Sequence, residues 1–112
     1  MYLINRAAAV VKLRQPFLDW VNSMPGPKHT LKAINTENNV FLLPEHDTQQ
    51  ELELIIQDLY RQIFEIEVGS FCRDRSLWPK TRDYKTFRQW FDIQVHSMVF
   101  DPYEDEIEKE EL

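Results

Sequence analysis

The spacing of apolar residues predicts one long helix in the middle of the chain. Between residues 48 and 68, apolar side chains recur every three or four positions, which places them on one helical face: Leu52, Ile55, Ile56, Leu59, Tyr60, Ile63 and Phe64. Thr48 and Glu51 have the spacing of a capping box, in which side chains accept hydrogen bonds from free amides at a helix start. We expect this helix to span about residues 48–68 and to stop at Gly69, because glycine is common just after a helix.

Two shorter segments show the same helical spacing. Residues 16–24 begin with Pro16, which suits a first helical turn, and they carry one apolar stripe: Phe17, Trp20, Val21 and Met24. Residues 83–91 begin with Asp83, a good N-cap, and their rings fall on one stripe: Tyr84, Phe87, Trp90 and Phe91. Both segments are predicted to be helices that turn their rings towards a core.

Three segments have the patterns of strands. Residues 6–13 form a continuous apolar run, which predicts a central strand buried on both faces. Residues 38–45 begin with a turn signal, continue with an apolar run and reach a proline that ends the strand. In residues 92–101, successive side chains fall alternately on the two faces of a strand. The order strand-helix-strand-helix-helix-strand predicts a two-layer α+β fold with a small three-stranded sheet packed against helices. We expect one domain over residues 1–100 and a flexible acidic tail over residues 101–112.

The charge is distributed unevenly and predicts a bipolar surface. The net charge of −6 comes from residues 101–112, since the acids and bases of residues 1–100 cancel. Residues 44–67 are acidic, whereas residues 73–88 are basic. We name five of these basic residues the basic rim and expect them to bind a protein partner or a second copy of the chain: Arg73, Arg75, Arg82, Lys85 and Arg88.

Glycine and cysteine usage excludes several kinds of site. With two glycines, Gly26 and Gly69, the chain cannot build a phosphate-binding loop or a dinucleotide fingerprint. With one cysteine, Cys72, it cannot form an internal disulfide or a thiolate-rich metal site. Two interpretations of Cys72 stay open: a small buried side chain, or a nucleophile activated by Arg73 and Arg75.

Metal and cofactor chemistry is not predicted. The three histidines lack the spacing of a metal motif. One group of polar side chains lies close together in sequence, and we interpret it as a solvated loop leading into the long helix: Glu45, His46, Asp47 and Glu51. We therefore predict no metal, no cofactor and no assembled catalytic group.

The segment "SLWPKTRDYKTFRQWF", residues 76–91, mixes rings with bases and has two interpretations. Rings and bases can bind single-stranded nucleic acid when the rings are exposed. Here the helical spacing turns the rings inward, which favours the corner of a core with the bases outside it. The acidic net charge also disfavours a polyanion, so nucleic acid is the second alternative and not the main hypothesis.

His96 is the one candidate for a general base. It lies in the third predicted strand, and Asp92 or Asp101 could orient its imidazole while Arg82 binds an anion. The competing interpretation is a structural strand residue, which we favour. A small enzyme with a pocket near His96 is therefore the first alternative function.

Location follows from two observations. The apolar run between Arg6 and Lys12 is too short for a signal peptide or a membrane span, and the single cysteine fits a reducing compartment. We expect a cytoplasmic protein that does not bind membranes.

Five segments spread over residues 5–101 resemble an uncharacterised family of small bacterial cytosolic proteins: "NRAAAVV", "QPFLDW", "VFLLPE", "LWPKTRDYKTFRQWF" and "VHSMVFD". The resemblance implies a compact bacterial domain. It carries over no catalytic residue, because no activity is established for that family. The main functional hypothesis is a non-enzymatic interaction or accessory module.

Overall fold

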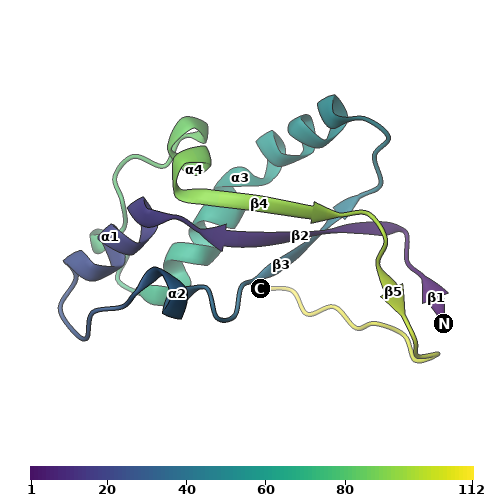
Figure 1. Ribbon diagram of the computed structural model, residues 1–112, viewed down its shortest axis with the longest axis horizontal. Coiled ribbons are helices and arrows are strands. Elements are labelled where there is room, and N and C mark those ends of the chain that lie inside the picture. Colours follow the sequence, from purple (N-terminus) through teal and green to yellow (C-terminus); the bar gives the residue numbers. More distant parts are fainter.

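Strand β2 (Arg6–Leu13) is the central strand of a three-stranded antiparallel sheet in the computed structural model, which describes residues 1–112. It pairs with β3 (Val40–Pro44) on one side and with β4 (Phe91–His96) on the other (Figure 1). The predicted α+β class and the predicted central position of the first strand are confirmed.

The two faces of the sheet differ in burial. Alternate residues of β2 are buried against the helices: Ala7, Ala9, Val11 and Leu13. The residues between them are only half-buried, so the expectation that β2 is buried on both faces is wrong. Helices cover one face of this sheet, and an antiparallel sheet tolerates solvent on the other. The opposite face exposes two large apolar side chains on the edge strand, Val40 and Leu42.

Helix α3 (Gln49–Phe71) lies against the covered face of the sheet (Figure 1). Its N-terminus is capped as predicted, because the Thr48 hydroxyl accepts a hydrogen bond from the Glu51 amide at 3.1 Å. The Glu51 carboxylate in turn accepts from the amide of Asp47 at 2.8 Å, one residue earlier than in a standard capping box.

The predicted end of this helix at about residue 68 is wrong, because α3 continues through Gly69 to Phe71. A β-carbon built on Gly69 would lie 3.5 Å from the ring of Trp78. This is an ordinary van der Waals distance, so the Trp78 indole packs against α3 at Gly69 without requiring glycine there.

The shorter helical elements are α1 (Gln15–Ser23), α2 (Leu31–Ile34), the 3₁₀ turn η1 (Arg75–Leu77) and α4 (Tyr84–Trp90). Asp83 caps α4 as predicted, since its carboxylate accepts a hydrogen bond from an amide of the first turn at 2.8 Å. A lipid bilayer could not be spanned by any helix of the protein, since each is too short or too polar.

Aromatic rings from four elements meet in the core. The most buried rings, each no more than 1% exposed, come from α1, α3, α4 and β4: Phe17, Phe64, Phe87 and Phe91. The Phe64 and Phe91 rings meet edge to face with centres 5.1 Å apart. Together these rings join the helical layer to the end of the sheet.

A second, two-stranded sheet lies beyond the main one. It pairs β1 (Tyr2–Leu3) with β5 (Phe100–Asp101), and the Ile4 amide donates to the Val99 carbonyl at 3.0 Å. The prediction of one strand over residues 92–101 is therefore wrong, because the chain bends after β4 and starts a separate strand. Asp101 was assigned to the tail but belongs to β5, and the residues after it are irregular and exposed.

Candidate interaction surface

Two members of the basic rim, Arg75 and Arg82, stack on the ring of Trp78. Their guanidinium carbons lie 4.8 Å and 5.6 Å from the ring centre, which is within cation–π range. Arg82 also lines a hollow of about 190 Å³ together with Arg61 and Glu65. These guanidinium groups are therefore held in place by packing.

The other members of the rim are exposed and unpaired. Arg73 follows α3, whereas Lys85 and Arg88 project from α4. The only ion pair in the protein joins Arg14 to Asp92 at 3.7 Å. The acidic tail thus forms no ion pair with the rim, although its last residue, Leu112, lines a hollow together with Arg75 and Trp78.

The rings of residues 76–91 pack into the core and do not form an open stacking platform. Phe87 is fully buried, and Trp78 and Trp90 are half-buried. The Trp78 indole donates a hydrogen bond to the Cys72 carbonyl at 2.8 Å. Trp90 has three aromatic neighbours with ring centres 5.5–6.3 Å away: Phe17, Trp20 and Phe64. Base stacking requires free ring faces, which this arrangement does not offer.

The structure does not bring His96 together with the carboxylates that were expected to orient it. His96 is exposed on the open face of the sheet, opposite Ala8, and its imidazole makes no hydrogen bond. Asp92 lies four residues earlier on the same strand, roughly 13 Å away at the usual rise per residue, and pairs with Arg14. Asp101 accepts a hydrogen bond from the Tyr103 amide.

The polar group at the start of α3 does not assemble into a metal site, and no set of three histidine, cysteine or acidic side chains converges anywhere in the protein. Glu51 is engaged by the Asp47 amide, and the His46 ring lies 3.2 Å from the Pro44 carbonyl. The half-buried Cys72 has its sulfur 3.5 Å from the Asp74 carbonyl.

A cluster of exposed apolar side chains covers the end of the molecule formed by β1 and β5. We call it the end patch, and its six members are between 48% and 81% exposed: Met1, Tyr2, Leu3, Met98, Phe100 and Tyr103. Strand pairing brings residues from both ends of the chain to this end, with Leu3 and Phe100 on one face of the small sheet and Tyr2 on the other. This cluster was not predicted from the sequence, although the apolar runs "MYLI" and "MVF" are signals that indicate it.

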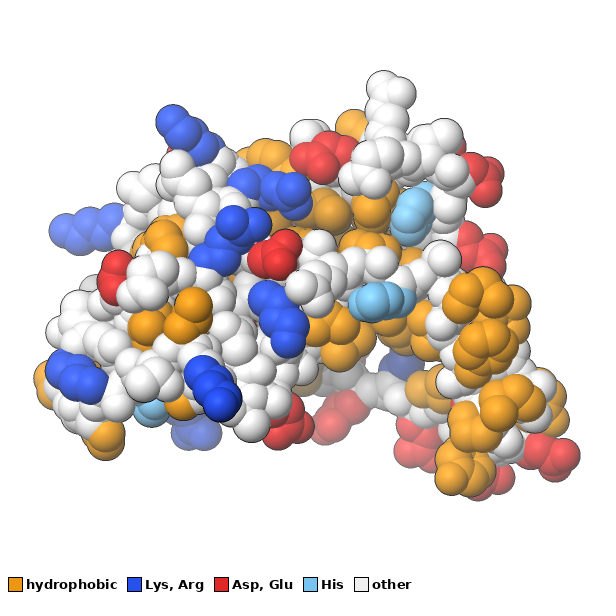
Figure 2. Space-filling model, in the orientation of Figure 1, with side chains coloured by type: hydrophobic (Ala, Val, Ile, Leu, Met, Phe, Trp, Pro, Cys, Tyr) orange, Lys and Arg blue, Asp and Glu red, His pale blue; other side chains and the backbone are white.

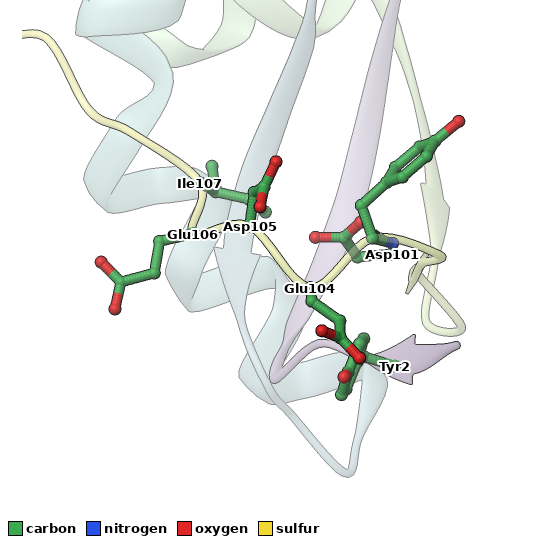
Figure 3. Close-up of a pocket in the computed structure, with 7 residues that line it drawn as sticks. Tyr2, Asp101, Glu104, Asp105, Glu106 and Ile107 are labelled. Atoms are coloured by element: carbon green, nitrogen blue, oxygen red, sulfur yellow. Dashed lines mark hydrogen bonds between the residues drawn. The ribbon is translucent and has the colours of Figure 1, made fainter.

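A hollow of about 390 Å³ lies beside the end patch and is lined mainly by acidic residues. We call it the acidic hollow, and its lining residues are Tyr2, Asp101, Tyr103, Glu104, Asp105, Glu106 and Ile107. Figure 3 shows Glu104 next to Tyr2 at one end of the hollow and Asp105 next to Ile107 at the other. Apolar and negatively charged groups thus alternate around it.

Charge and apolar surface are separated along the length of the molecule. Lysine and arginine gather at the end that holds α1 and α4, whereas hydrophobic and acidic side chains gather at the end with β1 and β5 (Figure 2). The molecule measures 45 Å along its longest axis. It therefore presents two chemically different ends, of which only one carries the end patch.

Tyr84 links α4 to α3 through a hydrogen bond from its hydroxyl to the Glu53 carboxylate. Burial, reinforced by this carboxylate, raises the pKa of Tyr84 to about 12. The contact holds the exposed face of α4, with Lys85 and Arg88, in a fixed position relative to α3.

Glu67 is the one buried charged residue of the core. It is 3% exposed, and its carboxylate accepts a hydrogen bond from the Asn39 side chain at 3.0 Å. Burial raises its pKa above the ordinary value of 4.5, an effect that the hydrogen bond from Asn39 partly opposes. Glu67 lies away from the end patch, so we assign it to the energetics of the fold.

We expect Glu67→Gln to stabilise the protein at neutral pH, because it removes a buried carboxylate whose ionisation lowers the free energy of unfolding. A raised folded-state pKa means that the native state binds the proton more tightly, so wild-type stability falls as pH rises from about 4.5 through that pKa. Urea unfolding between pH 4 and 8 should show this fall in the wild type and a flatter profile in the variant. Glu65→Gln, on the exposed side of α3, is the matched control; equal profiles for wild type and Glu67→Gln would contradict the prediction.

No family model, curated protein or solved structure matches the chain. The resemblance to small bacterial cytosolic proteins therefore stays a prediction.

Proposed function

We propose that the chain is a non-enzymatic interaction module that docks a protein partner through the end patch. The observation that carries the proposal is the exposure of six large apolar side chains on one end of the molecule. Monomeric proteins seldom expose this many large apolar side chains at one end unless they bind something. The single cysteine is compatible with our expectation that this interaction takes place in the cytoplasm.

The bipolar charge supports the same function. The basic rim and the acidic hollow lie on different parts of the surface and form no ion pairs with each other. Separated charges of this kind orient a partner during its approach and contribute more to specificity than to affinity. The end patch supplies the contact, and the charges select the orientation.

Site-specific photocrosslinking in the native host tests this proposal. A benzophenone side chain at Phe100 should give a discrete crosslinked species, and the same group at Leu54, which is exposed on α3, should not. The substitution Leu3→Asp should abolish the Phe100 crosslink, because it places a charge within the docking surface. The same benzophenone side chain at Lys85 tests whether a partner contacts the basic rim.

The contrary results are equally specific. Crosslinking from Leu54 as strong as from Phe100 would mean that the end patch is not selective. If Phe100 gave no crosslink while Lys85 did, docking would move to the basic rim. In that case the variant with Arg82, Lys85 and Arg88 all changed to Glu should lose the partner.

A further inference from the structure

The acidic hollow has negative charge that nothing in the protein neutralises. Four carboxylates line it, no basic side chain lines it, and none of the four forms an ion pair: Asp101, Glu104, Asp105 and Glu106. The only hydrogen bond to any of them is the one from the Tyr103 amide to Asp101. Unpaired acids next to an apolar surface attract a partner that carries positive charge.

The apolar part of the same end suits a partner with its own apolar side chains. Met1 and Met98 are flexible and polarizable, so they adapt to the shape of what they contact. Tyr2, Phe100 and Tyr103 are rings, which lose little conformational freedom when they become buried at an interface. The end patch is therefore suited to bind apolar side chains of different shapes.

The backbone of this end is also incompletely paired. In the small sheet, β1 and β5 each have a neighbour on one side only. An extended segment could add to such an edge through main-chain hydrogen bonds, and its alternate side chains would then face the sheet or the solvent. This geometry suits an extended peptide in which apolar and charged residues alternate.

From these three observations we infer that the end patch and the acidic hollow bind an extended cationic peptide segment of a partner protein, in which lysine or arginine alternates with apolar residues. The inference rests on the proposed docking function and specifies its partner. Like charges disfavour the other occupants: an anionic membrane surface, a nucleic acid, and a second copy that presents the same acidic end.

Fluorescence anisotropy with the full chain and short labelled peptides tests the inference. Three peptides separate the contribution of positive charge from that of apolar side chains: an alternating Lys-Val peptide, an alternating Glu-Val peptide and an alternating Lys-Gly peptide. We expect the Lys-Val peptide to bind at low salt, the Lys-Gly peptide to bind at least tenfold more weakly, and the Glu-Val peptide not to bind. Binding of the Lys-Val peptide should weaken as salt is raised.

Two variants with the same change in net charge separate the effect of the acidic hollow from the effect of the total charge. The triple variant Glu104→Gln, Asp105→Asn, Glu106→Gln should weaken Lys-Val binding about tenfold, which corresponds to roughly 0.5 kcal/mol for each exposed charge contact. The control Glu108→Gln, Glu110→Gln, Glu111→Gln removes the same charge outside the hollow and should weaken it much less. Phe100→Ser should also weaken binding about tenfold, whereas Leu54→Ser should not change it.

Each other outcome overturns the inference in a recognisable way. Equal binding of the Lys-Val and Glu-Val peptides would refute a cationic partner, and equal loss in the two charge variants would refute a site at the hollow. Self-association in sedimentation experiments that Phe100→Ser abolishes would assign the surface to a second copy. If no peptide binds while the Phe100 crosslink persists, the docking function stands and its cationic partner is wrong; loss of both refutes both.

Discussion

Phe17→Ala is expected to lower the free energy of unfolding by about 3–5 kcal/mol. The Phe17 side chain is fully buried, and its ring centre lies 5.3–6.0 Å from four other rings: Trp20, Phe71, Trp90 and Phe91. Alanine would leave a cavity between α1, α3 and β4 that these bulky rings cannot fill. Urea unfolding followed by circular dichroism measures the loss.

A domain of this size has a total stability of about 5–15 kcal/mol, so Phe17→Ala could leave too little folded protein to measure. Phe17→Leu, expected to cost about 1–2 kcal/mol, keeps the test quantitative. Leu54→Ala is the matched control, because Leu54 is 57% exposed and its loss should stay within about 0.5 kcal/mol. A loss for Phe17→Ala no larger than the control's would contradict the described core.

Trp90→Ala should lower the free energy of unfolding by about 3 kcal/mol, less than Phe17→Ala because the indole is only half-buried. The result bears on function as well as on stability. An exposed ring that binds a ligand contributes little to the free energy of unfolding. The Trp90 ring instead packs against Phe17, Trp20 and Phe64. Chemical denaturation of the wild type and the variant gives the difference directly.

Trp90→Phe should retain most of that stability, since a smaller ring still contacts the same neighbours. Tyr103→Ala is the control for an exposed ring and should cost less than about 0.5 kcal/mol. A cost under about 1 kcal/mol for Trp90→Ala would indicate an accessible ring, and nucleic-acid binding by residues 76–91 would then need to be reconsidered.

Sequence patterns predicted the local elements well because the signals are local. The capping residues Thr48 and Asp83 make the predicted hydrogen bonds. The apolar stripes of α1, α3 and α4 turn inward, since helical spacing alone places these residues on one face. One exception is Gly69, at which α3 does not stop but continues to Phe71.

Among features that depend on distant pairing, only the central position of β2 was predicted. A run of small and apolar residues at 6–13 does not reveal whether helices cover one face of the sheet or both. The pairing of Tyr2 with Asp101 joins nearly the whole length of the chain and leaves no periodic signal. For this reason the end patch, the main element of the proposed function, appears only in three dimensions, whereas the bases of the rim were recognisable from composition.

The central position of β2 also determines when the protein can fold during synthesis. Its residues leave the ribosome early, yet Ala8 pairs with His96, which is made almost at the end. Until β4 emerges, one edge of the growing sheet lacks its neighbour and the apolar face is incompletely covered. Nascent chains stalled before β4 should therefore depend on chaperones, and helix α3, whose caps and contacts are local, is the part able to form first.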